Sequence, residues 1–137
     1  MNRNDFKKLS RIRVAEAKTL LDAGQYSGAY YLCGYAVECA IKACIAKQTG
    51  KHDFPDKQRV TDSWSHEFNK LVTVAGLQAS LEMEIQGNAE FGPNWKTVKS
   101  WSERSRYDVS PQSKAEDLYK AVTDRQHGVL KWLRQHW

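Results

Sequence analysis

The stretch YSGAYYLCGYAVECAIKACIAKQT, residues 26–49, decides which fold this chain can adopt. It contains no proline, is rich in alanine and is apolar on nearly every face. A helix that is apolar all round must be buried on more than one side. The stretch therefore predicts a long helix that is either central in its own domain, or packed between its own bundle and a second subunit. Small residues would let a neighbour approach this helix closely: Gly34, Ala36, Ala40 and Ala43.

The chain on either side of this stretch also has helical periodicity, interrupted by glycine and proline. Apolar residues recur at helical spacing from residue 5 to about 23, and Gly24 is placed to close that helix. Residues 50–63 contain Gly50 and Pro55 and are predicted to form an exposed loop. Further helices are expected at about 64–75, 77–86 and 94–103, and a long closing helix with an apolar stripe from 115 to 133.

No segment shows sustained period-two alternation or an Asn-Gly hairpin signal, so no β-sheet is expected. The sequence predicts an all-α fold: an up-and-down bundle of four to five helices, with a long central second helix and a long C-terminal helix. At 137 residues the chain is long enough to bury a hydrophobic core, and we expect one domain spanning residues 1–137.

The charge of the chain favours anionic partners. The formal net charge is +5, and most of the excess lies in the first twenty residues. Such a basic helix could meet nucleic acid or an acidic partner protein, or it could be a solvated helix face.

The three cysteines, Cys33, Cys39 and Cys44, lie within the apolar stretch at spacings that match no zinc or redox motif. We expect them to be small buried hydrophobes in a reducing compartment. The first ten residues are polar and give no targeting signal, and the apolar run 29–46 is a poor membrane span because it contains Glu38 and Lys42. A soluble, cytoplasmic protein without a membrane partner is therefore expected.

Neither a metal nor a cofactor is expected. None of the four histidines, His52, His66, His127 and His136, has another His, Cys or carboxylate at metal-binding helical spacing. The glycines fit no phosphate-binding loop or dinucleotide fingerprint.

Glu38 stands out because an isolated carboxylate is costly to bury in an apolar helix. Lys42 lies four residues further on and can pair with it along the same face. The two residues could form a partly buried ion pair, or they could be polar groups that face a functional cleft.

A second charged feature is WSERSRYDVSPQSKAED, residues 101–117, between two predicted helices. A guanidinium binds carboxylate or phosphate through two parallel hydrogen bonds, so Arg104 and Arg106 suit an anion site. Tyr107 and Trp101 could stack a base beside them, or belong to the core. We predict that a ligand binds through Arg104, Arg106, Tyr107, Glu38 and Lys42.

Four pieces of the chain together resemble the HEPN domain family: AKTLLDAGQYSGAYYLCGYAVECAIKACIAK (17–47), SHEFNKLVTVAGL (65–77), SWSERSRYD (100–108) and the closing helix. The resemblance implies a helical bundle that is commonly a homodimer. It also implies one of two functions. Many members are metal-independent endoribonucleases, often toxins of toxin–antitoxin pairs, and others are non-catalytic partners of a minimal nucleotidyltransferase that are thought to bind nucleotide or substrate.

In the ribonucleases four to six residues separate an arginine from a histidine that follows it; the histidine is the general acid or base, and the arginine stabilises the transition state. Counting from Arg106, those places hold Pro111, Gln112 and Ser113, and counting from Arg104 they hold Val109, Ser110 and Pro111. Because the histidine is missing, the sequence favours nucleotide or RNA binding. Two alternatives stay open: a ribonuclease that uses His66 or Tyr107, and a purely structural Arg106 bound to Glu38.

Overall fold

The computed structural model describes residues 1–49, 54 and 56–137. The described helices follow one another in the order α1 (Arg3–Asp22), α2 (Tyr26–Gln48), α3 (Lys57–Ser63), α4 (Phe68–Val74), α5 (Gln78–Gly87), α6 (Phe91–Lys99), the 3₁₀-helix η1 (Glu103–Tyr107), α7 (Gln112–Thr123) and α8 (Val129–Arg134). No strand occurs among these residues, so the predicted all-α class is confirmed.

Local sequence signals set both ends of α1. Asn2 and Asp5 form a reciprocal capping box at its start, in which the side chain of each residue accepts a hydrogen bond from the backbone N–H of the other. At its end Gly24 has φ +76, and the N–H groups of Gly24 and Gln25 donate to the carbonyls of Leu21 and Leu20. This is a Schellman motif, which turns the chain back into α2.

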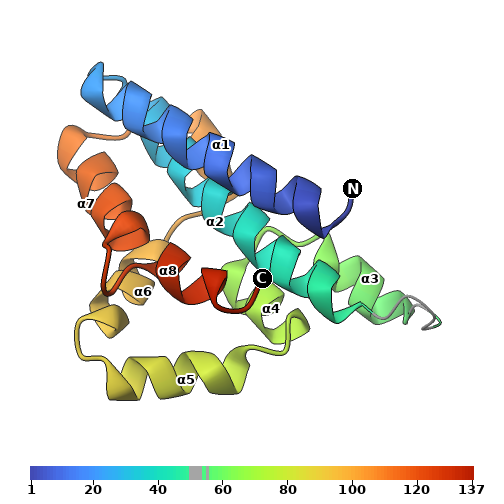
Figure 1. Ribbon diagram of the computed structural model, residues 1–137. Coiled ribbons are helices and arrows are strands. Elements are labelled where there is room, and N and C mark those ends of the chain that lie inside the picture. The colour runs from blue at the N-terminus through green and yellow to red at the C-terminus, as the bar shows by residue number, and fades with distance from the viewer. Residues whose placement is uncertain (50–53, 55) are drawn as a thin grey trace.

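The helix α2 is central, as its sequence predicts. It runs beside α1 in the opposite direction (Figure 1) and also contacts α4, α7, α8 and η1. Inside the contact with α1 the buried Ser10 hydroxyl donates to the carbonyl of Ala36 at 2.8 Å. Contacts with other helices of the same chain therefore explain why α2 is apolar on nearly every face, and a second subunit is not needed to explain it.

By length and composition alone α2 could cross a membrane, and it is the one such helix among the described residues. However, 72% of its most apolar window is buried inside the protein. The three predicted buried thiols, Cys33, Cys39 and Cys44, are part of that buried surface.

The prediction of one long C-terminal helix is wrong in one respect, because two shorter helices, α7 and α8, take its place. Asp124 ends α7, and its Oδ1 accepts hydrogen bonds from the backbone N–H groups of Gln126 and His127. Gly128 then lies so close to the Asp124 backbone that a Cβ there would meet its carbonyl oxygen at 2.4 Å. The chain turns at this point, and α8 packs back against α2, α6 and α7.

The predicted loop 50–63 is only partly a loop, and residues 50–53 and 55 fall outside the described residues. Asp56 caps α3 by accepting hydrogen bonds from the N–H groups of Gln58 and Arg59, so residues 57–63 are helical. The helix expected at 64–75 begins later, at Phe68. A short segment, residues 64–67, is left between α3 and α4.

Candidate functional site

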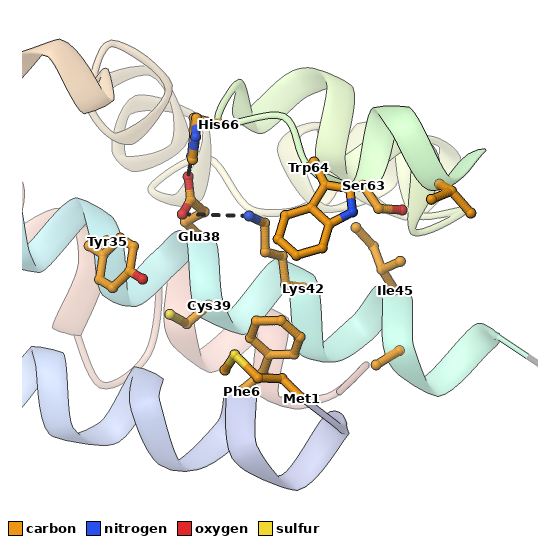
Figure 2. A pocket seen from close by; sticks show the side chains of 12 residues that line it. Met1, Phe6, Tyr35, Glu38, Cys39, Lys42, Ile45, Ser63, Trp64 and His66 are labelled. Carbon is orange, nitrogen blue, oxygen red and sulfur yellow. Dashed lines mark hydrogen bonds and ion pairs between the residues drawn. The ribbon is translucent and has the colours of Figure 1, made fainter. Parts of the chain in front are cut away.

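Glu38 is the centre of a polar network in the middle of α2. The residue is 2% exposed, and its carboxylate meets two partners. Oε2 lies 3.8 Å from the Lys42 ammonium, and Oε1 lies 2.6 Å from Nδ1 of His66. The predicted ion pair between Glu38 and Lys42 is therefore present, and Figure 2 shows it together with the His66 contact.

His66 comes from the segment between α3 and α4 and joins that segment to two other elements. Its Nε2 lies 3.0 Å from the carboxylate of Glu103 in η1, opposite the nitrogen that faces Glu38. A carboxylate oxygen therefore lies within hydrogen-bonding distance of each ring nitrogen. The ring thus links α2 to η1.

The two carboxylates that flank His66 cannot converge on one metal ion, because the ring lies between them. Among the described residues no group of three or more His, Cys, Asp and Glu side chains is placed to hold a metal. The network is a polar bridge that joins α2, residues 64–67 and η1.

One side of the bridge faces a pocket of about 430 Å³ between α1, α2 and α3, which we call the α1–α2–α3 pocket. Its lining is mostly apolar, and the connected side chains of Glu38, Lys42 and His66 form its polar end. The lining residues are Met1, Phe6, Tyr35, Glu38, Cys39, Lys42, Ile45, Ala46, Val60, Ser63, Trp64 and His66.

His66 also lines a second cavity of about 500 Å³, which lies between the start of α4 and η1 and which we call the α4–η1 cleft. This cleft is polar, and its lining includes two exposed cations, Arg104 and Lys99, and the carboxylates of Glu67 and Glu103. Its complete lining is Ser65, His66, Glu67, Phe68, Asn69, Lys99, Trp101, Ser102, Glu103 and Arg104.

Arg106 and Tyr107 lie in η1 but line neither cavity. The Arg106 guanidinium lies over the Tyr107 ring at 4.9 Å, and Tyr107 is 77% exposed. The neighbouring Tyr107 side chain is the largest cause that raises the pKa of Arg106. The pair forms an exposed surface on the same 3₁₀-helix that carries Arg104.

Two sequence-based alternatives are wrong. Arg106 does not pair with Glu38, whose described partners are Lys42 and His66. Trp101 is not a stacking platform, because it is 4% exposed and stacks on Phe68 inside the core, with ring centroids 5.2 Å apart.

The structure thus brings Glu38 and Lys42 together in one cavity and places Arg104 in the next. Sequence reasoning named His66 only as an alternative acid or base, and it missed the contribution of Glu103, Trp64 and Lys99. Periodicity could not reveal these contacts, because Glu38 and His66 are 28 residues apart and their contact depends on where the segment 64–67 folds back.

Comparison with known proteins gives one match. A family model described as HEPN domain matches residues 5–136, nearly the whole chain. No curated protein and no solved structure matches the chain.

Proposed function

Because the chain belongs to the HEPN domain family, which has nucleotide- and RNA-related functions, we propose that it binds the phosphates of a nucleotide or an RNA segment in the α4–η1 cleft. The cellular role that fits this binding is that of a partner of a minimal nucleotidyltransferase, or of one member of a toxin–antitoxin module. In either role we propose that the protein is a homodimer.

The observation that carries the proposal is the pair of cations in the cleft. Arg104 and Lys99 are exposed, and neither takes part in an ion pair among the described residues. A guanidinium can bind a phosphate through two parallel hydrogen bonds, and a nearby ammonium adds to the attraction. Arg106 and Tyr107 extend this basic surface along η1, where Tyr107 can stack an unpaired base.

Titration with a short single-stranded RNA at several salt concentrations tests the proposal. Affinity should fall linearly with salt on logarithmic axes, because phosphate contacts release counterions. Arg104→Ala should weaken binding and reduce the slope by roughly 0.7, the contribution of one phosphate contact on a single strand. Arg125→Ala is the matched control, since Arg125 is exposed on the turn between α7 and α8 and lines neither cavity. Binding that is absent, or that does not depend on salt, would refute the proposal.

The partner role and the homodimer have separate tests. We expect the protein to co-purify with a nucleotidyltransferase or antitoxin encoded by a neighbouring gene, and to have twice the mass of one chain by light scattering. A monomer that captures neither protein would contradict both assignments while leaving RNA binding untouched.

A second candidate function, metal-independent endoribonuclease, is favoured by the position of His66. His66 lines the same cleft as Arg104, with Glu38 hydrogen-bonded behind the ring. In such a reaction the ribose 2′-oxygen attacks the adjacent phosphorus, the bond to the 5′-oxygen breaks, and a cyclic phosphate and a 5′-hydroxyl result. His66, as a neutral imidazole whose Nδ1–H donates to Glu38, would accept the 2′-hydroxyl proton at Nε2 after leaving Glu103 and would pass it to the departing 5′-oxygen, while Arg104 would stabilise the charged transition state.

RNA incubated with the protein in the presence of a chelator decides this second candidate. Cleavage by the wild type that is lost in both His66→Asn and Arg104→Ala supports it. No cleavage, or equal cleavage by all three proteins, removes it.

A further inference from the structure

We propose that the α1–α2–α3 pocket takes the base of the bound nucleotide, so that the ligand is a mononucleotide or a single strand with one unstacked base, and not a duplex. This inference rests on the proposed function, because it assumes that the phosphates lie in the α4–η1 cleft. It adds a base-recognition site formed by Trp64, Phe6, Lys42 and Glu38.

The walls of the pocket are suited to a flat aromatic ring. Trp64 is 75% exposed at the end of α3, although a large apolar side chain is normally buried. Phe6 from α1 also lines the pocket, and in the view of Figure 2 it lies below α2 while Trp64 lies above it. An indole that is already exposed beside an apolar pocket can stack any of the four nucleobases, because every base has a π-face.

The polar end of the pocket offers donors and an acceptor for the edge of the base. The Lys42 side chain is only 12% exposed, and its one polar contact among the described residues is the 3.8 Å approach to Glu38. An ammonium has three N–H donors, so Lys42 retains donors for the ring nitrogen or carbonyl oxygen of a base. Its Nζ also lies 5.9 Å from the centre of the Trp64 ring, so the donor and the stacking surface are adjacent.

His66 connects this pocket to the phosphate site, because it lines both cavities. A nucleotide whose phosphate meets Arg104 can therefore direct its base past His66 toward Lys42 and Trp64. A base that is paired in a duplex has its Watson–Crick edge and its stacked faces occupied, and it cannot leave its stack without a free-energy cost. The pocket thus selects unpaired bases.

The experiment compares the affinities of three ligands: a short single-stranded RNA, an abasic ribose-phosphate strand of the same length, and an RNA duplex. The wild type should bind the single strand about tenfold more tightly than the abasic strand, as expected for one stacked base, and should bind the duplex no better than the abasic strand. In a Tyr107→Ala background, which removes the other exposed aromatic ring beside the cleft, Trp64→Ala and Lys42→Met should each lose this preference and keep the affinity of the background protein for the abasic strand. Met83→Ala, which removes another exposed apolar side chain on α5, should keep the preference.

The outcomes separate the inference from the proposed function. Salt-dependent binding of all three ligands with equal affinity, or a preference that survives Trp64→Ala in the Tyr107→Ala background, overturns the base pocket and leaves the phosphate site standing. Absence of salt-dependent binding to any of the three overturns the proposed function and the inference together. Circular dichroism of each variant shows whether it is folded, and Trp64→Ala alone remains decisive if Lys42→Met does not fold, since Trp64 is exposed.

Discussion

Glu38 can remain in the middle of α2 only because its charge is compensated. A buried carboxylate without partners would cost several kcal/mol, whereas Lys42 and His66 each supply an opposite charge or a hydrogen-bond donor. The same compensation makes Lys42 dependent on Glu38, because its side chain is also largely removed from water. The two residues should therefore behave as a unit in stability measurements.

Replacing Glu38 alone should be far more harmful than replacing both members of the pair. We expect Glu38→Leu to lower the free energy of unfolding by about 3–5 kcal/mol, because Lys42 is left as a buried, uncompensated charge. Glu38→Leu combined with Lys42→Leu should recover much of that loss, since no charge remains to be desolvated.

Urea unfolding of the two single variants and the double variant measures this coupling as a double-mutant cycle. Additive losses in the double variant would mean that Glu38 and Lys42 do not interact in the folded protein.

At the scale of the elements, the approach of η1 to α2 depends on the absence of a side chain at Gly34. A Cβ at this position would lie 2.2 Å from the indole ring of Trp101, which precedes η1. Trp101 is held on its other faces by Phe68 and Tyr31, so it has little room to move. The glycine is thus required for packing and not for a special backbone conformation.

We therefore expect Gly34→Ala to lower the free energy of unfolding by about 1–3 kcal/mol through overpacking, even though alanine is the better helix former. Gly87→Ala in α5 is the matched control, because a Cβ there meets nothing within 4 Å. The control should be neutral or stabilising by up to about 1 kcal/mol. Denaturant unfolding of both variants gives the comparison, and equal effects of the two substitutions would contradict the packing explanation.

The sequence predicts helices well where one helix has its own start and stop signals, and poorly where two helices share one apolar stripe. The end of α1 at Gly24 and the length of α2 follow from residue type alone. The break between α7 and α8 does not, because Val122 and Val129 lie seven residues apart and keep the helical period across the turn. The break is determined by Asp124 and Gly128, because the turn that these two residues form ends the helix although the apolar periodicity continues.

The candidate site, like the helices, could be predicted from the sequence only in part. Glu38 and Lys42 were predictable as a pair because both lie on one helix at a spacing of four. The placement of Arg104 in one cavity, and of Arg106 outside both, depends on how η1 is oriented, which residue type does not reveal. His66 escaped prediction as a bridging residue because its partners come from two other elements.

At the scale of the whole molecule, the three buried thiols make the stability of the fold dependent on alkaline pH. Burial raises the pKa of Cys33 and Cys44 to about 12 and that of Cys39 to about 11. In the unfolded chain a thiol has a pKa of about 8.5. Below that value both states are neutral and the thiols have no effect on stability. Above it the unfolded chain loses protons that the folded protein keeps, so stability falls as the pH rises.

Each thiol should remove up to about 1.4 kcal/mol of unfolding free energy per pH unit above roughly pH 9. The effect can be isolated with Cys33→Ala, which should show a shallower decline than the wild type between about pH 9 and 11. Urea unfolding at a series of pH values measures both slopes. Parallel slopes for the two proteins would mean that Cys33 ionises equally in the folded and the unfolded state.

Because His66 is a wall common to both cavities, ligands bound in the two cavities would be coupled thermodynamically through it. A ligand that draws the ring away from Glu103 in the α4–η1 cleft also changes the wall of the α1–α2–α3 pocket. By reciprocity, if the first ligand changes the affinity for the second by some factor, the second ligand changes the affinity for the first by the same factor. One imidazole ring in a short connecting segment is thus sufficient for two binding events to act cooperatively or antagonistically within a single small domain.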